Sequence, residues 1–389
     1  MYNILTLNSI SQTGLARFPK GQYTIASELA KPDAILLRSY NMHSMEIPSM
    51  LQAVGRAGAG VNNIPVDALS KRGVPVFNAP GANANAVKEL VVTGMLLASR
   101  HICQAWDYAR HLEGDDASIE KQVEDGKKRF VGFELPGRTL GVVGLGAIGV
   151  QVANVALKLG MQVVAYDPKI TVQSAWKLSS EARQAASMND LLSKADFVSF
   201  HVPLDESTRH IINADRIKVM KGGAVILNFS REGIVDDEAV CHAIKSGKLY
   251  GYVCDYATNL LKEHERVITL PHIGASTGEA EENCAIMVVD QVRDYLENGN
   301  IVNSVNFPEV VLPRSEGFRI GIANANVPNM VGQISTAMAK ANLNIIDLIN
   351  KSRGDIAYTL ADVNNEVPGT VLDQIKKIDG VLNVRVIQG

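Results

Sequence analysis

The chain has 389 residues, of which 46% are hydrophobic, and its 38 basic and 41 acidic residues leave a formal net charge of −3. This length allows two to four domains of about 100–200 residues each. The charge balance gives no basic signature for nucleic-acid binding, and the apolar stretches are too short for a membrane span, so no membrane partner is expected.

The four cysteines stand apart from one another in the sequence, at Cys103, Cys241, Cys254 and Cys284. No Cys-x-x-Cys pair is present, which argues against a metal site and against a disulfide framework. The sequence therefore predicts a soluble cytoplasmic protein without a bound metal.

Short β-branched runs alternate with helix-length segments over most of the chain. Several runs, such as Leu140-Gly-Val-Val, are apolar without polar alternation, as in parallel strands buried on both faces. The sequence thus predicts an α/β fold with doubly wound parallel sheets. The predicted strands are Ala34–Leu37, Val74–Asn78, Thr139–Val143, Gln162–Tyr166, Phe197–His201, Ala224–Asn228 and Val267–Leu270.

Two further features divide the chain. One helix is predicted from Ala86 to about Arg110, before the polar, charged stretch Glu113–Arg129. Later, Val310–Gly317 reads as a linker, and the remaining residues alternate as strand, helix, two strands, helix and strand. This βαββαβ order predicts a small ferredoxin-like α+β unit. Its predicted elements are Phe318–Ala323, Met330–Ala341, Ile345–Ser352, Ile356–Val363, Thr370–Ile378 and Val381–Ile387.

A glycine-rich turn, Gly144-Leu-Gly146-Ala-Ile-Gly149, follows one predicted strand and opens a helix. In a dinucleotide-binding unit, the first glycine permits the tight turn, the second lets the backbone approach the pyrophosphate, and the third lets helix pack on strand. Asp167 ends the next strand, where a carboxylate accepts hydrogen bonds from ribose hydroxyls and repels a 2′-phosphate. The pattern predicts NAD rather than NADP, the alternative being a purely structural turn.

From these motifs, residues 1–307 resemble the D-isomer-specific 2-hydroxyacid dehydrogenase family, and the carboxyl-terminal unit resembles an ACT regulatory domain. The resemblance implies a substrate domain of residues 1–88 and 277–309, a Rossmann NAD domain of residues 89–276, and an ACT domain of residues 317–389. The matching stretches are Leu37-Arg-Ser39, Gly58–Ile64, Gly144–Gly149, His201-Val-Pro-Leu204, Asn228–Asp236 and Pro271–Thr277.

The resemblance also implies the site residues. Arg231 would bind the substrate carboxylate, since a guanidinium does so bidentately and stays charged, and His272 would be the general base. Asp255 would contact the nicotinamide carboxamide. The cofactor-binding residues implied are Gly144, Gly146, Ala147, Ile148, Gly149, Asp167, His201, Val202, Pro203, Phe229, Ser230, Asp255, Gly274 and Ala275.

The sequence departs from the family pattern at one position. The family places a glutamate, which supports the histidine, a few residues after the aspartate equivalent to Asp255. Here Asn259 or Leu260 stands there. Either a shifted loop brings Glu263 or Glu265 to His272, or the base works unassisted, or the chain turns over poorly.

The pairing with an ACT-like unit resembles the branch of the family that oxidises 3-phospho-D-glycerate, the first step of phosphorylated L-serine synthesis. Arg38, Ser39 and Asn83 are the expected substrate contacts. Asn326 and Asn344 match positions that bind serine in inhibited members, although Asn324 and Asn329 replace a usual histidine and glycine. L-Serine is therefore a possible effector, and oligomer contact is the alternative role of this unit.

Other functions remain open on the sequence alone. The chain could oxidise another D-2-hydroxy acid, of the 2-hydroxyglutarate or glyoxylate type. It could also be an NAD-responsive binding protein like the transcriptional corepressors on this fold. The resemblance further implies a homodimer or homotetramer.

Overall fold

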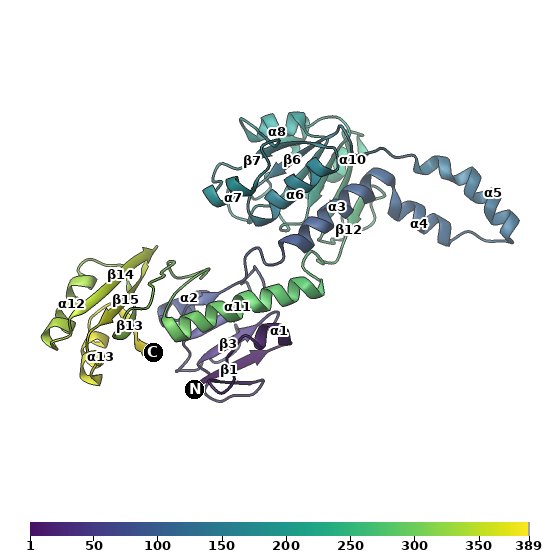
Figure 1. Ribbon diagram of the computed structural model, residues 1–389. Coiled ribbons are helices and arrows are strands. Elements are labelled where there is room, and N and C mark those ends of the chain that lie inside the picture. The colour runs from purple at the N-terminus through teal and green to yellow at the C-terminus, as the bar shows by residue number, and fades with distance from the viewer. Residues whose placement is uncertain (388–389) are drawn as a thin grey trace. The chain divides into compact units, whose positions relative to one another are not determined.

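The computed structural model describes residues 1–387, which form two compact units. One unit contains Met1–Ala82 together with the chain from Gly278 onward, and the other is Asn83–Thr277. Two parallel sheets and one antiparallel sheet form the framework. The α/β class and the small α+β unit that the sequence predicts are confirmed (Figure 1).

The first unit begins with a five-stranded sheet in the order β2-β1-β3-β4-β5, in which all neighbours are parallel. Its long helix α11 (Gly278–Asn298) packs so closely that a Cβ on Gly55 would lie 2.7 Å from Val288. Glycine is therefore required in this strand. The other elements are β1 (Tyr2–Leu7), α1 (Gln12–Leu15), β2 (Tyr23–Ala26), β3 (Ala34–Leu37), β4 (Ala53–Arg56), α2 (Val66–Lys71) and β5 (Val76–Phe77).

The second unit has a seven-stranded parallel sheet in the order β12-β11-β10-β9-β6-β7-β8. Helix α3 (Ala84–Arg100) and helix α6 (Ala147–Lys158) pack on one face through an apolar cluster that includes Val91, Val152 and Phe197. The remaining elements are β6 (Thr139–Val143), β7 (Gln162–Tyr166), α7 (Val172–Lys177), β8 (Arg183–Gln184), α8 (Met188–Lys194), β9 (Phe197–Phe200), α9 (Ala214–Val219), β10 (Ala224–Asn228), α10 (Asp237–Lys245), β11 (Leu249–Cys254) and β12 (Val267–Thr269).

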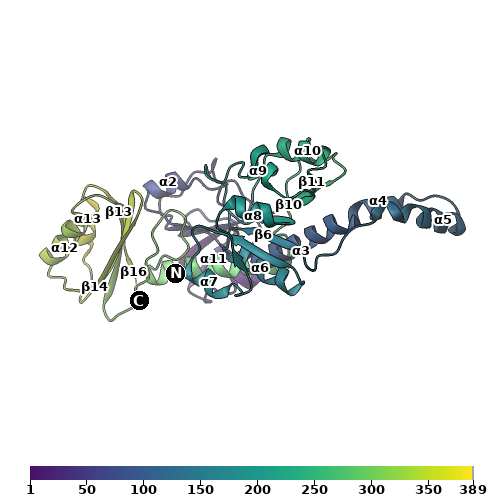
Figure 2. The same ribbon diagram turned by 90° about the horizontal axis from the view of Figure 1, so that it is seen from above.

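A helical arm extends from this second unit (Figures 1 and 2). The prediction of one helix over residues 86–110 was wrong, because His101 adopts a left-handed conformation with φ 52° that ends α3 and starts α4 (Ile102–Arg110). The charged stretch after it also contains a helix, α5 (Asp116–Gly126), since the Asp115 carboxylate caps the Ser118 N–H. A 3-10 turn, Lys127–Phe130, leads back to the sheet.

The carboxyl-terminal part of the first unit is an antiparallel sheet in the order β14-β15-β13-β16. Its two helices cover one face (Figure 2), so the predicted βαββαβ order is confirmed. The elements are β13 (Phe318–Ala325), α12 (Met330–Lys340), β14 (Ile345–Arg353), β15 (Ile356–Val363), α13 (Gly369–Lys376) and β16 (Val381–Ile387).

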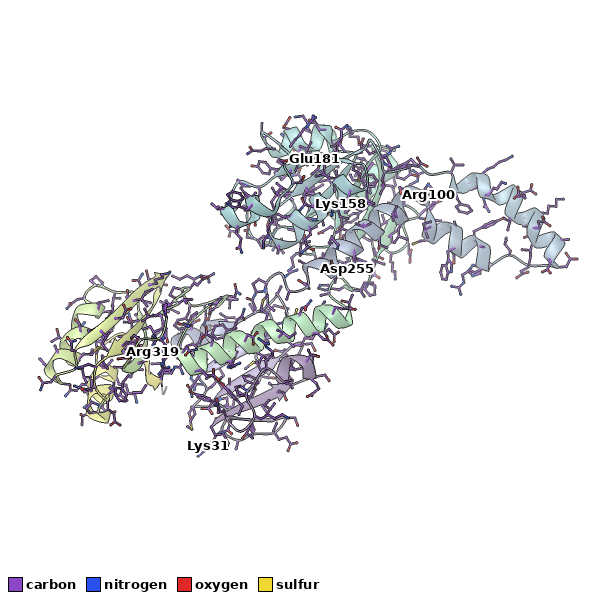
Figure 3. The ribbon with its side chains drawn as sticks, in the orientation of Figure 1. Lys31, Arg100, Lys158, Glu181, Asp255 and Arg319 are labelled. Atoms are coloured by element: carbon purple, nitrogen blue, oxygen red, sulfur yellow. The ribbon has the colours of Figure 1, made fainter. Side chains whose placement is uncertain are left out.

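The other face of this sheet packs against the end of α11. The buried Arg319 (labelled in Figure 3) pairs with its cross-strand neighbour Asp362 at 2.6 Å. Its other N–H groups donate to the carbonyl groups of Asn298, Leu312 and Pro313, so all five guanidinium donors are satisfied. This arginine therefore ties the sheet to the helix end and the linker.

Among residues 1–387, no helix combines the length and the apolar character that a bilayer crossing requires.

Candidate active site

The glycine-rich turn lies where the order of strands in the seven-stranded sheet reverses, between β6 and β9. Gly144 has φ +89°, and a Cβ there would lie 2.5 Å from the carbonyl oxygen of His201, which follows β9. A Cβ on Gly149 would lie 1.9 Å from the carbonyl oxygen of Gly144. Both glycines are thus required by the packing of turn, helix and neighbouring strand.

Gly146 differs from these two glycines. Its backbone, with φ −73° and ψ −163°, is open to any residue, and a Cβ there would meet nothing within 4 Å. No protein contact explains a glycine at this position, which begins α6 and has no side-chain cap. The exposed Gly146 and Ala147, with the half-buried Ile148, form the open start of α6, and the backbone N–H groups of a helix N-terminus suit a pyrophosphate.

Asp167, directly after β7, is hydrogen-bonded through its carboxylate to the glycine-rich turn. One carboxylate oxygen accepts the Leu145 N–H at 2.8 Å, and the other accepts the Lys169 N–H at 2.8 Å. Each oxygen still has a second lone pair. The structure thus gives Asp167 a role in shaping the turn that the sequence did not reveal, and its contact with ribose stays a prediction.

His201, Val202 and Pro203 follow β9 beside the turn. The His201 ring lies 2.9 Å from the Ser199 hydroxyl, and its Nδ1 atom is buried without a hydrogen-bond partner among the described residues. Burial lowers the pKa of His201 to about 3, so the ring is neutral. His201 therefore contributes its backbone, and no charge, to the surroundings of the glycine-rich turn.

The loop after β10 carries Arg231. Asn228 is 1% exposed and folds this loop, because its amide donates to the Arg231 carbonyl group at 2.9 Å and its oxygen accepts from the Ser230 hydroxyl at 2.9 Å. Phe229 is buried against α3, so only its backbone is available to a cofactor. The Arg231 side chain is exposed, and it donates to the Ser230 carbonyl group at 2.7 Å.

The loop after β12 carries His272, which adopts a left-handed conformation with φ 56°. A non-glycine residue is held there only where the surroundings impose it. Asp255 (Figure 3), 1% exposed at the end of β11, supplies that constraint by accepting the N–H groups of Ile273 at 2.8 Å and Gly274 at 2.7 Å. Its predicted nicotinamide contact remains a prediction. Ala275 follows on the same loop and is half-buried.

Neither of the two glutamates considered from the sequence reaches the histidine. Glu263 and Glu265 are exposed, and no hydrogen bond or ion pair within residues 1–387 joins either carboxylate to His272. Leu260, one of the two residues at the position expected for a carboxylate, is 46% exposed. The aromatic ring of Tyr256 faces the histidine instead, with ring centroids 5.1 Å apart. Sequence reasoning missed this tyrosine, although it directly follows Asp255.

The predicted substrate contacts Arg38 and Ser39 lie after β3 in the first unit, and Asn83 precedes α3 in the second. The Arg38 guanidinium is paired with Glu281 at 2.5 Å. Arg56 ends the neighbouring strand β4, and its Nε donates to the Arg38 carbonyl group at 3.0 Å. The signal for this second guanidinium in the sequence is a basic residue at the end of the short run Ala53-Val-Gly-Arg56, a strand absent from the sequence-based prediction.

The predicted effector residues lie on the carboxyl-terminal sheet. Asn326 donates from its side chain to the Gly354 carbonyl group at 3.0 Å, and Asn344 is exposed. Asn324 is 1% exposed, and its Oδ1 atom has no partner among residues 1–387. Within the same residues, no group of three or more His, Cys, Asp or Glu side chains could hold a metal ion.

Comparison with known proteins gives the family. The family model for the D-isomer specific 2-hydroxyacid dehydrogenase, NAD binding domain, matches residues 93–274. The D-3-phosphoglycerate dehydrogenase of Haemophilus influenzae is 36% identical over 355 residues, which cover 88% of this chain and 83% of that protein. The enzyme of that name from Escherichia coli K12 is 34% identical over 350 residues, covering 87% of this chain and 82% of that protein.

The solved structures agree at the level of the fold. NAD+-bound 3-phosphoglycerate dehydrogenase of Entamoeba histolytica superposes with a TM-score of 0.61 at 24% identity, covering 78% of this chain and 98% of that one. The chain therefore belongs to the D-isomer specific 2-hydroxyacid dehydrogenases, and it carries their NAD-binding domain. Within that family, it belongs with the D-3-phosphoglycerate dehydrogenases.

The open start of α6 at Gly146 leads to a first prediction. Gly146→Val is expected to leave the fold intact but to weaken NADH binding at least tenfold, because the new side chain fills the space of the pyrophosphate. Fluorescence titration with NADH measures the affinity, and circular dichroism checks the fold. Gly222→Val is the matched control, since a Cβ on Gly222 also meets nothing within 4 Å. Equal NADH affinity in both variants would contradict the assignment of the turn.

Proposed function

We propose that the protein catalyses the NAD-dependent oxidation of 3-phospho-D-glycerate to 3-phosphohydroxypyruvate, the first step of phosphorylated L-serine synthesis. The observation that carries the proposal is that Arg231 and His272 follow the carboxyl ends of β10 and β12, the parallel strands on either side of β11, in a chain 36% identical to a D-3-phosphoglycerate dehydrogenase. Ligands of open α/β sheets bind at that edge.

In this proposal each residue has one task. The exposed Arg231 guanidinium binds the carboxylate of the 2-hydroxy acid through two parallel hydrogen bonds, which orients the C2 carbon. The His272 imidazole accepts the proton of the C2 hydroxyl as the carbonyl group forms. NAD, when bound, supplies the hydride acceptor. Gly146 and its neighbours hold the pyrophosphate, and Asp167 selects a ribose without a 2′-phosphate.

The substrate phosphate needs cationic partners. Arg38 follows β3, Arg56 ends the adjacent strand β4, and Ser39 adds a hydroxyl donor beside Arg38. Two guanidinium groups at one sheet edge suit a phosphate dianion. The proposal includes residues 1–88 and 277–309 as the substrate domain, 89–276 as the NAD domain and 317–389 as the regulatory domain. A cytoplasmic location is also proposed, and the free thiols of all four cysteines fit it.

The second prediction concerns turnover. The wild-type chain with NAD is expected to form NADH from 3-phospho-D-glycerate faster than from 2-hydroxyglutarate, lactate or glycerate. His272→Asn is expected to lower kcat by about 10²–10⁴-fold through loss of the base, and asparagine tolerates the left-handed backbone. Absorbance at the NADH band measures the rate.

Controls separate the alternatives. His210→Asn makes the same replacement at another exposed histidine with positive φ and should leave kcat unchanged. Turnover only on another 2-hydroxy acid would change the substrate assigned. No turnover on any of them, with NADH binding intact, would favour the NAD-responsive binding protein.

A homo-oligomer is a further part of the proposal, and the helical arm supports it. Trp106 is 61% exposed, Ile102 46% and Val131 76%, so the arm presents large apolar side chains to solvent, although the Arg110 guanidinium lies over the Trp106 ring, 4.5 Å from its centroid. A second copy of this chain is the proposed cover, giving a dimer or a tetramer.

The third prediction tests this surface. Trp106→Glu is expected to shift the chain toward monomer, because burying an unpaired carboxylate is costly. Analytical ultracentrifugation measures the mass. Trp176→Glu, at an 85% exposed tryptophan on α7, is the matched control and should leave the mass unchanged. An unaltered mass for both variants would remove the arm from the interface.

L-Serine remains the proposed effector, bound by Asn326 and Asn344. The exposed amide of Asn344 and the unpartnered Oδ1 of Asn324 support a polar ligand at the same sheet. The fourth prediction is that calorimetry of the wild type with L-serine gives binding heat and that Asn344→Ala abolishes it. No heat in the wild type, together with unchanged activity in serine, would remove the effector and leave oligomer contact as the role of this sheet.

A further inference from the structure

Three neighbouring strands bring three functional side chains to one edge of the sheet. Strands β10, β11 and β12 are adjacent and parallel, with Asn228 paired to Cys254 and Cys254 paired to Thr269. The carboxyl ends of parallel strands meet at the same edge. The loop after the first strand holds Arg231, the loop after the last holds His272, and Tyr256 follows the middle strand.

Tyr256 touches both flanking loops. Its ring lies against the His272 ring, with centroids 5.1 Å apart and planes at 58°. Its hydroxyl donates to the Ser230 carbonyl group, which also accepts the Arg231 guanidinium at 2.7 Å. The Cys254 thiol donates to the Tyr256 carbonyl group at 3.2 Å, which fixes the backbone beneath the ring. One half-buried side chain thus bridges the loops of Arg231 and His272.

The Tyr256 hydroxyl is suited to act as a hydrogen-bond donor that keeps its proton at neutral pH. Burial raises the pKa of the Tyr256 hydroxyl above its ordinary value, and the charge of Arg231 opposes that rise only in part. The hydroxyl therefore stays protonated at neutral pH and keeps its hydrogen bond to Ser230. The ring offers His272 a packing surface without adding a negative charge.

We propose that Tyr256 is a positioning residue of this active site, taking over from the absent carboxylate the task of orienting the His272 imidazole while its hydroxyl anchors the Arg231 loop. The proposal rests on the proposed function, because it assigns His272 as base and Arg231 as carboxylate ligand. It separates two tasks within one side chain: the ring orients the base, and the hydroxyl holds the carboxylate-binding turn.

The fifth prediction follows from this separation. Tyr256→Phe keeps the ring and removes the hydroxyl, so KM for 3-phospho-D-glycerate should rise roughly fivefold, as for loss of one neutral hydrogen bond, with kcat nearly unchanged. Tyr256→Leu also removes the ring, so kcat should fall about 10–100-fold as the imidazole loses its orientation. Steady-state kinetics under saturating NAD measures both constants.

A second readout does not depend on turnover. The ring current of Tyr256 should shift the side-chain NMR resonances of His272, so these resonances should move in Tyr256→Leu and stay nearly in place in Tyr256→Phe. The assignment comes from His272→Asn, which removes the signal.

The matched control is Tyr250→Phe. Tyr250 also bonds a histidine through its hydroxyl and packs against it, His101, with centroids 5.6 Å apart. It lies at the opposite end of β11, away from the carboxyl edge. This variant should leave KM, kcat and the His272 resonances unchanged.

The outcomes are distinct. An inactive wild type overturns the proposed function and, with it, the positioning role of Tyr256. An active wild type whose two tyrosine variants match it in KM and kcat overturns the role of Tyr256. Equal changes of kcat in Phe and Leu variants, without a resonance shift, would also overturn it.

Discussion

The Asp255 carboxylate makes the interaction on which the candidate active site depends. It is 1% exposed and accepts two consecutive backbone N–H groups, from Ile273 and Gly274. A buried carboxylate needs such donors, since without them the cost of removing its charge from water is not offset. The same two bonds stabilise the positive φ of His272, so the buried Asp255 carboxylate also fixes the backbone that places the His272 side chain.

The dinucleotide turn shows a similar use of a carboxylate. Asp167 accepts the Leu145 N–H and so shapes the loop on which Gly146 lies. The three glycines of the turn have different reasons to be glycine. Gly144 and Gly149 lack room for a Cβ, whereas Gly146 has room for one and lies where this fold brings the backbone close to a pyrophosphate. In both loops a buried or half-buried carboxylate fixes the backbone conformation. The exposed residues beside it remain accessible to ligands.

The carboxyl-terminal sheet is anchored by a third charged group, the Arg319–Asp362 pair. Burial alone would raise the pKa of Asp362, yet hydrogen bonds from Arg319 and Ser315 hold it below its ordinary value. Arg385 adds a contact with the Tyr295 ring of α11, 4.1 Å from its centroid. A sheet with both faces covered in this way is joined firmly to the end of α11.

The sequence by itself determined the fold class, the glycine turn and most strands, because apolar runs such as Thr139–Val143 and the spacing of the glycines are local properties. It also showed that Asn259 or Leu260 stands where a carboxylate is expected. It did not determine the break at His101, where a residue without glycine's freedom takes a left-handed conformation, nor the helix after Asp115 in a stretch rich in charge. Only the tertiary structure decided what faces His272, because Tyr256 meets it through strands β11 and β12 lying side by side, a long-range pairing that no local pattern encodes.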